Sequence, residues 1–151
     1  ETAYGNLCYD ITLKTFFLFL DKEHFPKKQI DQMVRNVDIV PTLLELMGVK
    51  QDKNFMKIDG ESLLGFINSN ENNKRIAFSE TGGISGPWPS SEEPNVHCVR
   101  TDKWKLIYNR TPKTYELYDL ENDSDEENNL YSKDREKGEE LKALLEQYKE
   151  F

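Results

Sequence analysis

Cysteine is scarce in this sequence. The two that occur, Cys8 and Cys98, stand far apart, and neither belongs to a Cys-x-x-Cys pair. A structural zinc site or a disulfide framework needs more cysteines at closer spacing, so neither is predicted. Because isolated cysteines are most often buried as small hydrophobic side chains, we expect two free thiols in preference to a bridge. Cysteine usage leaves the cellular compartment open.

Long apolar runs and clustered basic residues are also missing. The longest apolar run covers residues 16–20, whereas a membrane-spanning helix needs roughly 20 such residues. The 20 Lys and Arg residues are scattered and are outnumbered by 28 Asp and Glu residues, for a net charge of -8. Nucleic-acid binding normally needs a basic stripe with interleaved aromatic side chains. We predict neither a membrane span nor nucleic-acid binding.

Familiar catalytic signatures are absent as well. The sequence contains no GxGxxG, P-loop, GxSxG or HExxH motif. Its two histidines are His24, in a charged segment, and His97, next to Cys98 in a predicted strand. Neighbouring strand side chains point to opposite faces, so His97 and Cys98 cannot form a nucleophilic dyad. We interpret both histidines as structural.

The amino terminus lacks the marks of a natural start. Residues 1–5, ETAYG, include no initiator Met, no basic stretch and no apolar signal core. We therefore expect the chain to be a piece of a longer protein. Together with the missing catalytic signatures, this predicts a chain that by itself lacks the residues needed to run a reaction.

The apolar residues that are present suffice for one modest core. Hydrophobic residues make up 36% of the chain and charged residues 32%, which is a globular rather than a disordered balance. Residues 13–20 are typical of a strand buried on both faces. Residues 36–48 predict a helix, with Asp38 as its cap, Pro41 in its first turn and Gly48 at its end. The predicted core face of this helix comprises Ile39, Leu43, Leu46 and Met47.

The second half of the chain predicts an antiparallel meander and a closing helix. A turn at Asp59-Gly60 precedes a short helix that ends near residue 67. Strands are expected at residues 75–80, 96–100, 105–109 and 115–120, with a long irregular loop over residues 81–95. An amphipathic helix over residues 134–148 should cover one face of the meander, through Leu141, Leu144, Leu145 and Tyr148.

Two polar segments could in principle bind ligands. The acidic run of residues 121–127 suggests calcium, but an EF-hand loop starting at Asp123 would need Gly and Glu where Asn128 and Asp134 stand. We therefore expect a solvated turn. Residues 79–83, SETGG, join a strand to a glycine-bearing loop, which fits either an anion-binding backbone or a simple turn.

Six strings follow one another in the order of a known family. They are GNLCYDITLK (5–14), VDIVPTLLELMG (37–48), DGESL (59–63 with Leu64 following), FSET (78–81), VRTDKWKLI (99–107) and ELYDLEND (116–123) with ENNL (127–130). Taken together they resemble the distal part of the type I sulfatase family, within the alkaline phosphatase superfamily.

The resemblance implies an α+β fold. It predicts the last strand and helix of an α/β sulfatase core in residues 1–74. A small antiparallel sheet covered by a carboxy-terminal helix follows in residues 75–151. It also implies that this chain is the carboxy-terminal portion of a sulfatase-like hydrolase. Its partner is then the upstream catalytic portion, which would carry a formylglycine nucleophile and a divalent metal, usually calcium.

Two residues of the first string are candidates for substrate binding. The family's Lys or His that touches the sulfate, three residues before the Tyr, corresponds to Asn6, and Lys14 matches a basic position better interpreted as structural. Asn donates a hydrogen bond but brings no positive charge to an anionic transition state. Phosphodiester or phosphonate hydrolysis is an alternative within the superfamily, because this segment does not separate it from sulfate-ester cleavage. A non-enzymatic α+β interaction module is the other alternative.

Overall fold

The chain divides into two compact units. The computed structural model describes residues 7–20, 23, 25, 27–49, 57–68, 74–82 and 94–149. One unit joins Glu1–Phe16 to Arg75–Phe151, and the other consists of Phe17–Lys74. The division predicted from the sequence, at residues 74 and 75, concerns the domains of the family and stays a prediction.

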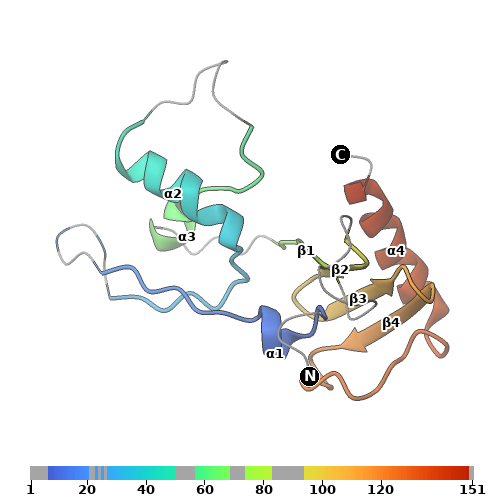
Figure 1. Cartoon of the computed structure of the whole chain (residues 1–151). Coiled ribbons are helices and arrows are strands. Elements are labelled where there is room, and N and C mark those ends of the chain that lie inside the picture. Colours follow the sequence, from blue (N-terminus) through green and yellow to red (C-terminus); the bar gives the residue numbers. More distant parts are fainter. Residues whose placement is uncertain are drawn as a thin grey trace. The chain divides into compact units, whose positions relative to one another are not determined.

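A four-stranded antiparallel sheet forms the centre of the first unit. Its strands are β1 (Ala77–Thr81), β2 (Val96–Arg100), β3 (Trp104–Asn109) and β4 (Thr114–Asp119), and they lie in the order β1-β2-β3-β4 (Figure 1). Each strand pairs with the next along the chain, so the sheet is the predicted meander. Together with the helices, it confirms the α+β class.

Helix α4 (Arg135–Lys149) covers one face of this sheet, as predicted (Figure 1). The Asp134 carboxylate caps the helix by accepting a hydrogen bond of 3.0 Å from the Lys137 amide. Leu141 and Leu145 are completely buried, and each contributes about 2 kcal/mol by leaving water. They pack against a row of apolar side chains from three adjacent strands: Val99, Leu106 and Leu117.

The opposite face of the sheet is covered by the segment that contains α1 (Asp10–Leu13). Cys8, just before this helix, is fully buried. It shares a core with side chains from β2, β3 and β4, namely Val96, Cys98, Ile107 and Tyr118. Both faces of the meander are therefore buried, whereas the sequence suggested a cover for only one.

The second unit contains a 3-10 turn, Asn36–Asp38, followed by α2 (Ile39–Leu46) and α3 (Leu64–Asn68). Gly48 ends the α2 segment with a φ of 67°, the left-handed conformation that its sequence position predicted. Asp38 does not cap the helix with its side chain. Its carboxylate instead accepts hydrogen bonds from the Arg35 amide at 2.8 Å and the Glu61 amide at 3.0 Å.

The predicted core face of α2 is wrong. Leu43, Leu46 and Met47 are 43%, 38% and 67% exposed. The buried residues are Asp38, Pro41 and Thr42, because Thr42 Oγ1 accepts a 2.9 Å hydrogen bond from the Leu63 amide and draws this side of the helix against residues 60–63. Polar contacts to a distant loop, rather than apolar periodicity, select the packed face.

The predicted strand at residues 13–20 is also wrong. Leu13 ends α1, and residues 14–20, all of them described, contain neither helix nor strand. Phe16, Leu18 and Leu20 are 90%, 70% and 85% exposed. A strand forms only where a neighbour accepts its backbone hydrogen bonds, and among the described residues none pairs with this segment.

Within the described part of the chain, no helix has the length and apolarity to cross a membrane.

Candidate functional site

The predicted substrate-binding residues lie at the start of the first unit. Asn6 is outside the described residues, and Lys14 directly follows α1 as its C-cap residue. The Lys14 amide donates a 2.8 Å hydrogen bond to the Asp10 carbonyl, and its side chain is exposed. The role of both residues in substrate binding stays a prediction.

The other sequence candidates lie on β1 and β2. Thr81 ends β1, and its carbonyl accepts a 2.9 Å hydrogen bond from the Asn95 amide. The ends of the loop between them are therefore held together, while residues 83–93 and His24 are outside the described part. His97 places Nδ1 3.6 Å from a carboxylate oxygen of Glu80 on the neighbouring strand. Cys98 points to the opposite face of β2, as its sequence position requires.

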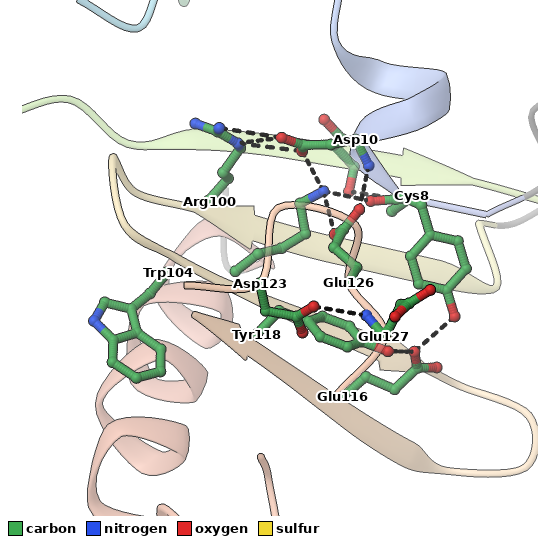
Figure 2. A network of polar contacts seen from close by, with 12 residues as sticks. Cys8, Asp10, Arg100, Trp104, Glu116, Tyr118, Asp123, Glu126 and Glu127 are labelled. Atoms are coloured by element: carbon green, nitrogen blue, oxygen red, sulfur yellow. Dashed lines mark hydrogen bonds and ion pairs between the residues drawn. The ribbon is translucent and has the colours of Figure 1, made fainter. Parts of the chain in front are cut away.

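A buried lysine occupies the centre of the face that α1 covers. Lys105, on β3, has no exposed side-chain surface, and its Nζ lies 2.7 Å from a carboxylate oxygen of Glu126. The same ammonium donates a 3.1 Å hydrogen bond to the Cys8 carbonyl and pairs with the Asp10 carboxylate. Lys105 thus joins three segments far apart in the sequence, in the network drawn in Figure 2.

The charges in this network compensate one another. Arg100 forms a second ion pair with Asp10, at 3.1 Å. Burial raises the pKa of the Asp10 carboxyl, but hydrogen bonds from Lys105 and Arg100 and their positive charges lower it more, so the pKa lies below the ordinary 3.8. The two carboxylates and two cations sum to no net charge, which is the condition for placing them in the interior.

Glu126 reaches the network from the acidic loop after β4. Its carboxylate accepts a 2.6 Å hydrogen bond from the Asp10 amide, and its own φ is 56°, an uncommon value for a residue with a side chain. The Asp123 carboxylate shapes the loop by accepting hydrogen bonds from the Glu127 and Asn128 amides, at 3.0 and 2.9 Å. The prediction of a solvated turn is therefore wrong for Glu126, which is buried.

A second polar cluster lies beside the first and centres on Glu116 (Figure 2). One Glu116 oxygen accepts 2.7 Å hydrogen bonds from the hydroxyls of Tyr9 and Tyr118, and the other accepts one from Asn109 at the same distance. Burial and the nearby Glu116 charge raise the pKa of Tyr9 to about 12, and they raise the pKa of Tyr118 as well. Both tyrosines remain neutral donors that hold residue 9 on the sheet.

This arrangement is suited to positioning rather than to catalysis. Asp10 and Glu126 are already neutralised by Lys105 and Arg100. Among the described residues, no group of three or more His, Cys, Asp or Glu side chains is placed to hold a metal ion. The network fixes residues 8–10 on the sheet, and these residues directly follow the segment in which the substrate contact is predicted.

The sequence interpretation did not find this network. Lys105 is flanked by Trp104 and Leu106 in a predicted strand, and no partner was predicted for it. A lysine that shares its strand face with Ile107 could have indicated a buried cation. Its two carboxylate partners lie 95 residues before it and 21 residues after it, so the pairing has no local signal.

The sheet, its carboxy-terminal helix and the covering amino-terminal segment define the class of the fold, an antiparallel α+β region covered on both faces. The family model of the N-sulphoglucosamine sulphohydrolase carboxy-terminal domain matches residues 6–150. The chain therefore belongs to this family.

Solved structures show the same relationship. BT4656, solved with its substrate D-glucosamine-2-N,6-O-disulfate, is 28% identical with a TM-score of 0.58, and the match covers 75% of this chain and 23% of that one. BT1596, a 2-O glycosaminoglycan sulfatase, is 27% identical with a TM-score of 0.58, over 74% and 23%. A sulfatase candidate from Bacteroides thetaiotaomicron is 28% identical with a TM-score of 0.57, over 74% and 23%.

The extent of these matches identifies the part of the family. This chain spans 23% of the length of each of the three solved proteins, and it corresponds to the carboxy-terminal portion of a sulfatase. In that family an amino-terminal catalytic portion precedes this region. No curated protein matches the chain.

Removing the buried cation should destabilise the protein strongly. We expect Lys105→Met to lower the free energy of unfolding by about 3–5 kcal/mol, because Asp10 and Glu126 would stay buried without their shared partner. Urea unfolding followed by circular dichroism measures the change. Lys103→Met is the matched control, since Lys103 pairs with Glu121 at the exposed surface, and its midpoint should stay close to wild type. Equal midpoints for the two variants would contradict the structural role of Lys105.

The same network predicts a dependence on pH. Since the pKa of Asp10 is lower in the folded protein, its contribution to stability is complete above the unfolded value of 3.8 and is lost as the pH falls through the folded value. Asp10→Asn should therefore flatten the loss of stability below about pH 4. Urea midpoints between pH 2 and 7 test this, with Asp125→Asn on the exposed loop expected to follow wild type. A wild-type slope in Asp10→Asn would be the contrary result.

Proposed function

We propose that the chain is the carboxy-terminal part of an enzyme that hydrolyses sulfate esters of sugars. The family match over residues 6–150 carries this proposal. Two of the similar structures, at 28% and 27% identity, are a protein solved with a disulfated glucosamine and a 2-O glycosaminoglycan sulfatase. A sulfated amino sugar is accordingly the substrate class that we assign to the whole enzyme.

In this proposal the upstream portion performs the chemistry. It supplies the formylglycine nucleophile and the divalent metal, most simply calcium, which together bind and attack the sulfate group. The present chain contributes Asn6 as a neutral hydrogen-bond donor toward the sulfate, with Lys14 farther along the same segment. The buried Lys105 network supports this role because it holds residues 8–10 in place.

The upstream portion is also the proposed partner of this chain, with no role for nucleic acid or a membrane. Phe16, Leu18 and Leu20 are apolar and highly exposed in the described structure. Apolar side chains grouped in one segment favour contact with another protein surface. An amino-terminal portion that covers residues 16–20 would bury these side chains.

The decisive assay uses the protein that joins this chain to its upstream portion. We expect it to release sulfate from 6-O-sulfated glucosamine or an aryl sulfate, and to lose this activity on removal of calcium with a chelator and regain it on readdition. Cleavage of a phosphodiester and of no sulfate ester would reject sulfatase activity and favour phosphodiester hydrolysis. Absence of activity toward both substrates, with the metal present, would reject the proposal and favour the non-enzymatic interaction module.

Asn6 offers a test of the substrate contact. In the same longer protein, Asn6→Lys should raise kcat/KM toward a sulfate ester at least about tenfold, because a positive charge is added where negative charge develops. Asn122→Lys, in the exposed loop after β4, adds the same charge elsewhere and should leave kcat/KM unchanged. An unchanged or lower value in Asn6→Lys would show that residue 6 does not face the sulfate.

A further inference from the structure

The two cysteines meet in the interior of the first unit. Cys8 and Cys98 are 0% and 1% exposed, and both belong to the core that α1 and its preceding residues form with the sheet. They are 90 residues apart in the sequence. Their encounter therefore results from the fold and has no local cause.

The strand register places Cys8 next to the residue pair that contains Cys98. The Cys8 thiol approaches the Ser79 carbonyl at 4.0 Å, and Ser79 is the residue paired with Cys98 across β1 and β2. Hydrogen bonding with Cys8 and burial hold the pKa of the Cys98 thiol well above its ordinary value, so this thiol stays protonated and unreactive while it is buried.

We propose that Cys8 and Cys98 form a modification site. A small disulfide oxidant converts the two thiols to a disulfide, either during folding or when the segment at residue 8 leaves the sheet. The bond would fasten the segment before α1 to β2. Both cysteines are free thiols in the structure. A disulfide needs sulfurs about 2.0 Å apart, and the shared core and the common neighbour Ser79 make the two side chains candidates for this approach. The inference is independent of the proposed enzymatic activity.

The chemistry is a pair of thiol–disulfide exchanges. One cysteine thiolate attacks oxidised glutathione, forming a mixed disulfide and releasing one glutathione thiolate. The second cysteine thiolate then attacks the protein sulfur of that mixed disulfide and releases the second glutathione. Two protons leave the cysteines, and the two electrons reduce the oxidant to two thiols. Because both sulfurs are buried, the first attack requires the segment at residue 8 to leave the sheet.

The bond would close a loop that contains the whole second unit, Phe17–Lys74. A loop of this size removes a large amount of freedom from the unfolded chain. By linkage, the folded state should favour the disulfide to the same extent. When the folded chain and the chain in urea are compared in the same glutathione buffer, the ratio of disulfide to dithiol should be roughly 1000-fold higher in the folded chain.

The experiment equilibrates the full chain in glutathione buffers with and without urea, traps the thiols by alkylation in acid-quenched samples, and maps them by mass spectrometry. The expected product is one intramolecular link between the peptides that contain Cys8 and Cys98, in monomeric protein. Cys8→Ser is the control and should give only a mixed disulfide at Cys98. A folded-to-unfolded ratio near one, glutathione on both cysteines, or linked dimers as the main product would each overturn the proposal.

A second measurement does not depend on the unfolded state. Oxidised chain cleaved by protease between residues 17 and 74 should remain one band on a non-reducing gel and separate into two when reduced. Immediate separation without reductant would also overturn the proposal. Where the link forms, the melting temperature of the oxidised chain should exceed that of the reduced chain by roughly 10 °C.

Discussion

The first unit depends on the ion pairs that the buried Lys105 ammonium forms with Asp10 and Glu126. A lone charge in the interior is strongly unfavourable, so the fold must bring it carboxylates from elsewhere. Asp10 arrives from before the second unit, and Glu126 from after the sheet. This requirement explains why the acidic loop turns inward through a residue with positive φ. It also explains why the segment around residue 10 packs on a sheet whose first strand begins as far along the chain as Ala77.

The two faces of the sheet consequently differ in character. The α4 face is an apolar contact that follows from nearby sequence, with Leu141 and Leu145 against a continuous apolar row. The α1 face combines an apolar patch around Cys8 with the ion network and the Glu116 cluster. Polar contacts have stricter distance and angle requirements than apolar ones. The second face therefore sets the position of residues 8–10 more closely than hydrophobic packing alone would.

The accuracy of the sequence predictions follows the range of the interactions involved. The four strands and α4 are predicted because strict alternation and helical spacing are local signals, and the family strings place them in order. The strand at residues 13–20 and the apolar face of α2 were wrong because neighbours distant in the sequence decide them: Thr42, for example, binds the Leu63 amide. The Lys105 network was missed for the same reason. Asn6 and Lys14 came from the family pattern alone, since local chemistry says nothing of a substrate.

The insertion of residues 17–74 between the two parts of the first unit has a consequence for the order of folding. During synthesis the segment at residues 7–13 emerges before the strands that it covers. The meander and α4 can assemble from contacts close in sequence, which form quickly. The face with Lys105 then stays open until residues 7–13 pack on it, with the 58 residues of the second unit in the intervening chain. We therefore expect that face to close after the meander and α4 have formed, with its apolar side chains open to solvent until then.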